Sequence, residues 1–137
     1  MKVVLTQDVK AQGKKGQLIE VGRGDLVGKY VGWTAQTVQA KFKEAIGGVL
    51  FIDEAYSLVN GSQDTYGEEA ISTLLKRMED DRDRLVVIVA GYDDLMPRFI
   101  DSNPGLKSRF NNFIHFDDYC PDELVAILES MCVKYQY

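Results

Sequence analysis

The chain has 137 residues, of which 45% are hydrophobic and 27% charged, and its formal net charge is −5. This composition favours one globular domain and excludes a low-complexity chain. No stretch reaches the ~18 apolar residues that a membrane helix requires, and the N-terminus lacks the apolar segment of a signal peptide. We therefore expect no membrane partner and a cytoplasmic location. The chain has only two cysteines, Cys120 and Cys132, which match no metal spacing. A reducing, cytosolic compartment is the simplest interpretation of this cysteine content.

Charge is distributed unevenly along the chain. Residues 1–17 carry four lysines and one aspartate, whereas the remaining residues carry 12 basic and 20 acidic side chains. An acidic body repels nucleic acid, while a short basic segment can approach phosphate groups. The basic segment at 1–17 and the acidic remainder differ in charge as if they came from two different proteins.

The N-terminal third is predicted to begin with two short strands. Residues 2–5 are apolar apart from Lys2, residues 10–16 form a turn rich in glycine and lysine, and residues 17–21 read as a second strand. A strand, a glycine-containing connection and a strand predict a β-hairpin. Residues 22–33 contain four glycines and are predicted to form a loop.

From Thr34 the apolar residues follow helical and buried-strand patterns. A first helix is predicted from the spacing of Ala35, Val38, Phe42 and Ala45. Residues 49–52 and 85–90 are continuous apolar runs, as expected of strands covered on both faces. Between them, after a polar loop at 60–65, a second helix is predicted to bury Ala70, Ile71, Leu74, Leu75 and Met78.

The C-terminal part continues the alternation. A short helix is predicted at 95–100, a strand at 111–116, and a final helix from Pro121 onward. The buried face of that last helix is predicted to consist of Leu124, Ile127, Leu128 and Met131. Strands that alternate with amphipathic helices predict an α/β fold with a parallel sheet flanked by helices.

Asp53 and Glu54 directly follow the apolar strand at 49–52. Ligands of parallel α/β sheets bind at the carboxyl ends of the strands. There Asp53 would hold Mg²⁺ through water, and Glu54 would polarise an attacking water molecule. The alternative is that Asp53 and Glu54 have no catalytic role and only begin a polar loop after the strand.

The phosphate-binding half of such a site is missing. Only two Gly-Lys steps exist, Gly13-Lys14 and Gly28-Lys29, and neither is followed by Ser or Thr. The residues five positions before the two glycines are Asp8 and Arg23, so neither step matches G-x-x-x-x-G-K-[ST]. The sequence therefore contains half of an ATPase site.

An ordered set of motifs identifies a family. It consists of Gly28-Lys29-Tyr30-Val31-Gly32, the run GGVLFIDEAYSL from Gly47 to Leu58, Ala90-Gly91-Tyr92, NPGLKSRF from Asn103 to Phe110, Phe116-Asp117-Asp118-Tyr119 and Glu123-Leu124. Over about residues 17–137 the chain resembles the AAA+ ATPases of the stage V sporulation protein K type, which are relatives of the red-type rubisco activases. The resemblance implies an AAA+ P-loop NTPase-like fold, ATP and magnesium as cofactors, ring assembly with other AAA+ subunits, and a polypeptide substrate.

The resemblance also implies roles for individual residues. Asp53 and Glu54 look like the Walker B pair, and Arg109 looks like the arginine finger that reaches into a neighbouring subunit's ATP site. Tyr30, with Val31, matches the pore loop that grips the polypeptide. Tyr92 stands where many AAA+ proteins have a polar sensor residue, and its role is left open. The alternatives without a functional role are that Tyr30 is a loop tyrosine packed on the sheet and that Arg109 is a surface arginine.

The first 21 residues have a second resemblance. Met1 to Leu5, Asp8-Val9-Lys10 and Gly13-Lys14-Lys15-Gly16 are similar to the start of bacterial large-subunit ribosomal protein nine, in which a basic loop approaches ribosomal RNA. We therefore predict three parts. Residues 1–21 form a ribosomal-protein-like hairpin, residues 17–118 form a partial AAA+ large domain, and residues 119–137 begin a truncated small domain.

Three functional hypotheses follow. The first is an AAA+ core without its central first strand and phosphate loop, which would be marginally stable or self-associating unless residues 3–5 take the place of that strand. The second is a non-catalytic module that assembles with complete AAA+ subunits. The third is an RNA-binding hairpin attached to an inert body, whose RNA affinity would depend on Lys14 and Lys15.

Overall fold

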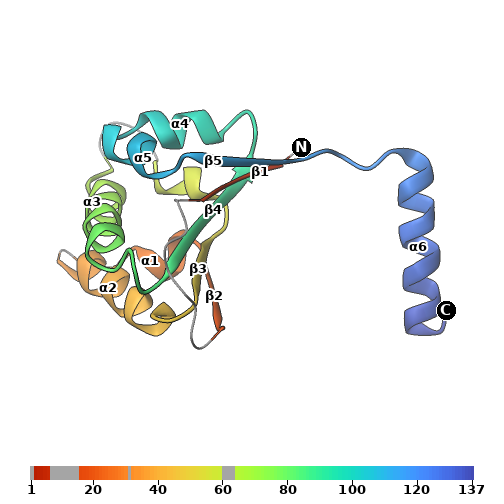
Figure 1. Cartoon of the computed structure of the whole chain (residues 1–137), viewed down its shortest axis with the longest axis horizontal. Helices are drawn as coiled ribbons and strands as arrows, with labels where there is room; N and C mark the ends of the chain where they lie inside the picture. Colours follow the sequence, from red (N-terminus) through yellow and green to blue (C-terminus); the bar gives the residue numbers. More distant parts are fainter. Residues whose placement is uncertain (1, 7–15, 31, 60–63) are drawn as a thin grey trace.

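The computed structural model describes residues 2–6, 16–30, 32–59 and 64–137, and of residues 2–6 it describes the backbone (Figure 1). In chain order the elements are β1 (Lys2–Thr6), β2 (Leu18–Val21), α1 (Arg23–Leu26), α2 (Trp33–Ala45), β3 (Val49–Ile52), the 3₁₀ helix η1 (Ala55–Leu58), α3 (Thr65–Asp80), β4 (Val86–Tyr92), α4 (Met96–Asp101), α5 (Pro104–Arg109), β5 (Asn112–Phe116) and α6 (Pro121–Tyr135).

A five-stranded sheet in the order β2-β3-β4-β1-β5 organises the body. Strands β2, β3 and β4 are parallel, with Val21 opposite Ile52 and Ile52 opposite Val89 at their carboxyl ends. This parallel sheet with its helices confirms the predicted α/β fold class. The carboxyl ends of β2 and β3 lie side by side, which brings the segments that follow them together.

Strand β1 lies between β4 and β5 and is antiparallel to both. In the described sheet β1 and β2 are separated by two strands, so the hairpin predicted for the two N-terminal strands is wrong. The physical reason is that β4 and β5 each offer an open backbone edge, and a strand between them forms ladders on both sides instead of one. Residues 3–5 thus belong to an interior strand of the sheet, with one strand on each side.

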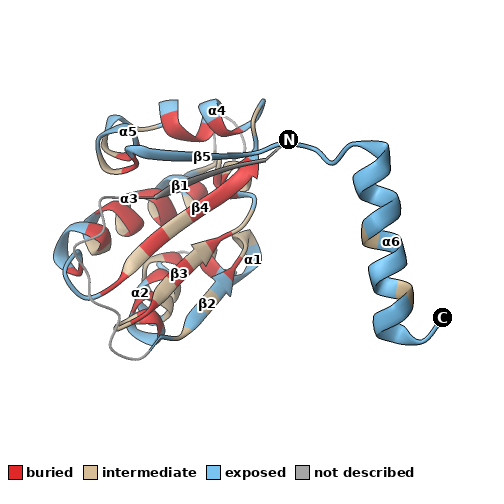
Figure 2. Ribbon diagram, turned by 45° about the vertical axis from the view of Figure 1, so that its right-hand side comes forward, coloured by how far each residue is buried: buried red, intermediate tan, exposed pale blue. Residues whose placement is uncertain are grey.

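The core is formed by one face of the sheet and the helices packed on it (Figure 2). Leu50, Ile52, Val87 and Val89 are fully buried, and their alternate neighbours Val49, Phe51, Val86 and Ile88 are half-buried. The predicted cover on both faces of these strands is therefore complete on one face only, because the other face is half-buried. Side chains of α2, α3, α4 and α5 join the inward-facing strand residues in a single core cluster.

Most helices lie where the apolar spacing predicts them. In α2 the residues Val38, Phe42 and Ala45 are fully buried, and in α3 the five predicted core residues are all buried. Three short helices were not predicted: α1 lies inside the expected glycine-rich loop, η1 follows Glu54, and α5 lies between the expected short helix and the strand β5. Each spans one turn or slightly more, which is too short to display a helical period.

Helix α6 stands apart from the body (Figure 1). It begins at Pro121 as predicted, and the Cys120 amide donates to Glu123 Oε2 at 2.8 Å at its start. Its predicted buried face is wrong: Leu124, Leu128 and Met131 are 53%, 61% and 52% exposed, and Ile127 is half-buried. The pattern identifies an apolar face, but no described element packs against it. Within the described part of the chain, no helix has the length and apolar character needed to cross a membrane.

Candidate functional site

Asp53 and Glu54 lie together at the carboxyl end of β3. The Asp53 amide donates to the carbonyl of Val21 at 3.0 Å, which ties this point to the end of β2. Asp53 Oδ1 in turn accepts from the Glu54 amide at 2.9 Å. Asp53 is half-buried and Glu54 is exposed, so a sheltered carboxylate and a solvent-facing carboxylate stand next to each other.

The backbone of Glu54 is in the left-handed region, with φ 50° and ψ 48°. Among the described residues the only other non-glycine with positive φ is Gln136 at the end of α6. Such a conformation is unfavourable for a residue with a side chain and often marks a functional site. Here it turns the chain sharply from β3 into η1, so that consecutive carboxylates project from the sheet edge.

A cavity of about 450 Å³ opens beside these carboxylates and is lined by Glu20, Val21, Gly22, Asp25, Asp53 and Glu54. Among the described residues, its lining contains four carboxylates and no basic side chain. Mg²⁺ binds proteins through one or two carboxylates and several waters, so this donor set fits a water-mediated magnesium ion. It does not fit a triphosphate, because the described lining offers no cation to neutralise the phosphates. The four carboxylates line the cavity without forming a direct metal cage, since no group of three or more His, Cys, Asp or Glu residues in the described ranges is arranged to hold a metal ion.

Tyr56 of η1 lies next to the acidic pair. Burial raises the pKa of its hydroxyl, and the neighbouring Glu54, Tyr92, Asp53 and Asp94 raise it further. These groups make the sheet edge strongly negative around Tyr56. Tyr56 was not predicted as a site residue, although it lies only two positions after Glu54 in the motif GGVLFIDEAYSL.

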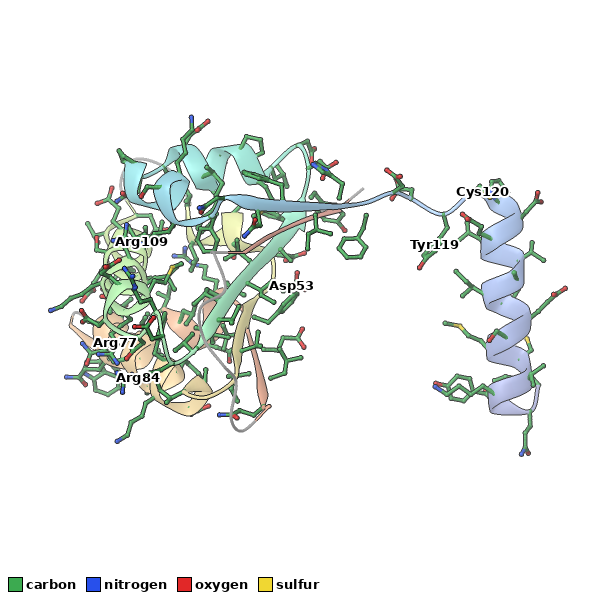
Figure 3. All side chains as sticks on the ribbon, viewed as in Figure 1. Asp53, Arg77, Arg84, Arg109, Tyr119 and Cys120 are labelled. Atoms are coloured by element: carbon green, nitrogen blue, oxygen red, sulfur yellow. The ribbon has the colours of Figure 1, made fainter. Side chains whose placement is uncertain are left out.

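Arg109, the last residue of α5, lies on the opposite side of the body from Asp53 (Figure 3). Asn103 starts this helix, since its Oδ1 accepts from the Gly105 amide at 2.8 Å. Arg109 Nη1 donates to the carbonyl of Gly105 at 3.2 Å, and its buried Nε has no hydrogen-bond partner in the described structure. The chain therefore does not bring Arg109 and the acidic pair into one site.

Tyr30 is 62% exposed, which excludes the alternative of a tyrosine packed on the sheet. Its ring contacts that of Trp33 edge-to-face with the centroids 4.9 Å apart, and Trp33 is itself 54% exposed. Val31 lies outside the described residues. Trp33 was not predicted as a site residue, although it follows the motif Gly28-Lys29-Tyr30-Val31-Gly32 directly.

Tyr92 ends β4 at the same sheet edge and is 44% exposed. The preceding residue, Gly91, lies against the Tyr56 ring, because a Cβ at Gly91 would lie 2.8 Å from Tyr56 Cε1. The glycine- and lysine-rich segment predicted to contact RNA lies largely in residues 7–15, outside the described ranges, so the ribosomal resemblance stays a prediction. The division into 1–21, 17–118 and 119–137 likewise stays a prediction.

Comparisons with known proteins agree on one family. The sequence profile of the "ATPase family associated with various cellular activities (AAA)" matches residues 4–118. The chain is 54% identical over 125 residues to the chloroplastic ribulose bisphosphate carboxylase/oxygenase activase of Cyanidioschyzon merolae, covering 90% of this chain and 43% of the relative. It is 48% identical over 123 residues to stage V sporulation protein K of Bacillus subtilis, covering 90% and 38%.

A third relative is the plasmid-borne protein CbxX of Cupriavidus necator, which is 50% identical over 125 residues, covering 90% of this chain and 39% of the relative. The chain thus spans less than half the length of these curated relatives.

Proposed function

Because this chain belongs to the ATPase family associated with various cellular activities, we propose that it is an AAA+ core with a half-built nucleotide site. Asp53 would hold Mg²⁺ through water, and Glu54 is the carboxylate that would orient an attacking water molecule if another chain or segment supplied the phosphate-binding half of the site. In this proposal the chain by itself neither binds ATP tightly nor hydrolyses it.

The observation that carries this proposal is the cavity beside Asp53 and Glu54, where every charged side chain among the described lining residues is a carboxylate. Carboxylates that face a triphosphate without a basic side chain repel it, whereas P-loop ATPases surround the phosphates with backbone amides and a lysine. The missing G-x-x-x-x-G-K-[ST] pattern points in the same direction.

A Mg²⁺-ATP titration by calorimetry tests this proposal on the full chain. The parent and the variant Glu54→Gln are both expected to show no saturable binding and no phosphate release. Glu129→Gln, which removes an exposed carboxylate on the distant α6, is the matched control. Saturable binding by the parent, with hydrolysis lost in Glu54→Gln and kept in Glu129→Gln, would show a working site and contradict the proposal.

A second candidate function is an assembly module that acts on a complete AAA+ subunit. The position of Arg109 favours it, because the guanidinium lies across the body from Asp53 and so cannot act together with Asp53 and Glu54 of the same chain (Figure 3). A guanidinium presented to a neighbouring subunit's ATP would stabilise the charge that develops on the transferred phosphoryl group. Ring assembly and a polypeptide substrate, as implied for the family, belong to this proposal.

The exposed pair Tyr30 and Trp33 supports a contact with polypeptide in this proposal. Aromatic side chains held at the surface bind extended chains through their large apolar area. Both side chains are accessible to a partner, since Tyr30 is 62% and Trp33 54% exposed. We expect Tyr30→Ala to weaken the capture of an unfolded polypeptide by mixed assemblies and to leave the stability of the chain unchanged.

Mixing with a full-length relative tests the assembly function. The parent chain is expected to co-sediment with the relative and to change its ATPase rate, and Arg109→Ala is expected to co-sediment without changing that rate. Arg82→Ala removes an exposed arginine at the turn after α3 and serves as the control. Failure of the parent chain to co-sediment would rule out the module.

A further inference from the structure

Strand β5 is one of the two outer strands of the described sheet and is exposed along its whole length. It pairs with β1 on one side, and no other described strand pairs with it. All five of its residues are exposed, including Phe113 at 56%, Ile114 at 48% and Phe116 at 56%. An apolar edge strand of this kind is a template for pairing with another chain, and natural proteins usually protect it with charges or a covering element.

The sequence of β5 suits pairing with a second copy of itself. In an antiparallel pair centred on Ile114, each Ile114 faces its counterpart, and each Phe113 faces His115 of the other copy. Phe113 and His115 share the face toward α4, where they line a cavity of about 310 Å³ together with Asp93, Met96, Pro97, Ile100 and Asp101. The second copy's Phe113 would therefore lie at the rim of this largely apolar cavity and cover it.

Charge favours the antiparallel direction. Lys107 and Arg109 lie before β5, and Asp117 follows its last residue. Antiparallel pairing places the basic beginning of one copy near the acidic end of the other, whereas parallel pairing places like charges together. Complementary charges of this kind fix the register and suppress the wrong orientation.

We propose that β5 is a self-association edge, through which two copies pair antiparallel about a two-fold axis at Ile114 and join their five-stranded sheets into one. The partner is thus a second copy of this chain, and the contact uses neither Asp53 nor Glu54. It is a two-fold contact, and it is distinct from the presentation of Arg109 to an ATP-binding subunit.

Charge variants at the axis test this proposal. Ile114→Lys would place two ammonium groups opposite each other, and Ile114→Glu two carboxylates, so each variant alone is expected to dimerise at least about tenfold more weakly than the parent. An equimolar mixture is expected to recover the dimer, because each Lys then faces a Glu. Sedimentation velocity over a concentration series gives the masses, and circular dichroism shows whether each variant is folded.

The exposed face of α6 supplies the control. Leu128→Lys changes a residue that is 61% exposed and is expected to leave the dimer unchanged. A parent chain that is monomeric at every concentration would overturn the proposal, as would dimerisation that Leu128→Lys abolishes and Ile114→Lys leaves intact. A mixture of the two folded Ile114 variants that stays monomeric would overturn the antiparallel pairing at Ile114.

Discussion

Arg23 and Asp64 form a two-point ion pair that joins α1 to the start of α3. Arg23 Nη1 lies 2.8 Å from Asp64 Oδ2, and Nη2 lies 3.2 Å from Oδ1. Arg23 Nη1 also donates to the carbonyl of Ser57 at 2.8 Å, in the 3₁₀ turn that follows Glu54. The Asp64 side chain is only 10% exposed, so water screens this pair less than an ordinary surface pair. The pair therefore holds the turn that positions the acidic site.

Asp64 is also the N-cap of α3, because its Oδ1 accepts a hydrogen bond from the Gly67 amide at 3.0 Å. We predict that Asp64→Ala lowers the free energy of unfolding by roughly 1–3 kcal/mol, since it removes both the cap and the partner of Arg23. Asp64→Asn keeps an oxygen for the cap and loses the charge, so a smaller loss is expected. Urea denaturation of the three proteins measures both effects. Equal stability of Asp64→Ala and the parent would show that neither interaction contributes.

Gly67 allows α3 to pass close to the end of η1. A Cβ at this position would lie 2.1 Å from the carbonyl oxygen of Leu58 and 2.7 Å from Asp64 Oδ2. We predict that Gly67→Ala destabilises the fold by roughly 1–3 kcal/mol, because backbone must shift to admit the methyl group. Gly24→Ala in α1 is the control, since its Cβ would meet no atom within 4 Å. Thermal unfolding should show a lower Tm for Gly67→Ala alone.

Tyr56 provides a prediction for alkaline pH. Burial and the nearby Glu54 raise the pKa of its hydroxyl above the ordinary value of 10.0. Above about pH 10 the unfolded chain loses this proton before the folded chain does, so stability decreases as pH rises through that range. We expect Tyr56→Phe to lessen this decrease and to remove a late step from the absorbance titration of phenolate. An unchanged titration curve in Tyr56→Phe would contradict the prediction.

The sequence predicted the central strands and the acidic pair because each rests on a local pattern. Val49 to Ile52 is a continuous apolar run that ends at two carboxylates. Such a run predicts a buried strand, and ligands of parallel sheets bind at the carboxyl ends of the strands. The left-handed backbone of Glu54 has no such signal, because no glycine or asparagine marks it. The acidic lining of the cavity also requires Glu20 of β2 and Asp25 of α1, the helix that follows β2. The pairing of β2 with β3 brings both carboxylates near Asp53.

The errors concern contacts between distant segments. Leu124, Leu128 and Met131 form an apolar helix face, and the pattern cannot show whether a partner for that face is present. The hairpin prediction favoured the nearest strand in sequence as the partner of residues 2–5. The two open edges of β4 and β5 provided the better partners, and their proximity is a property of the whole fold.

The position of β1 leads to the last prediction. A strand between β4 and β5 has hydrogen-bonding partners on both sides, and Val4 is opposite Ala90 on one side and Ile114 on the other. Proline lacks the backbone N–H and is tolerated almost only at sheet edges. We therefore predict that Val4→Pro lowers the free energy of unfolding by about 3 kcal/mol or more, whereas Val4→Thr, which keeps the N–H and a β-branched side chain, has a much smaller effect.

Hydrogen exchange gives the sharper measurement for these variants. If β1 completes the sheet, Val4→Pro should speed the exchange of amides in β4 and β5 and leave those of α3 less affected, because the ladders on both sides lose their shared strand. A Val4→Pro variant with the parent's stability and exchange rates would mean that residues 2–6 are not needed between β4 and β5. Residues 3–5 would then not substitute for the central strand, and the body would have to be stable as a sheet divided between β4 and β5.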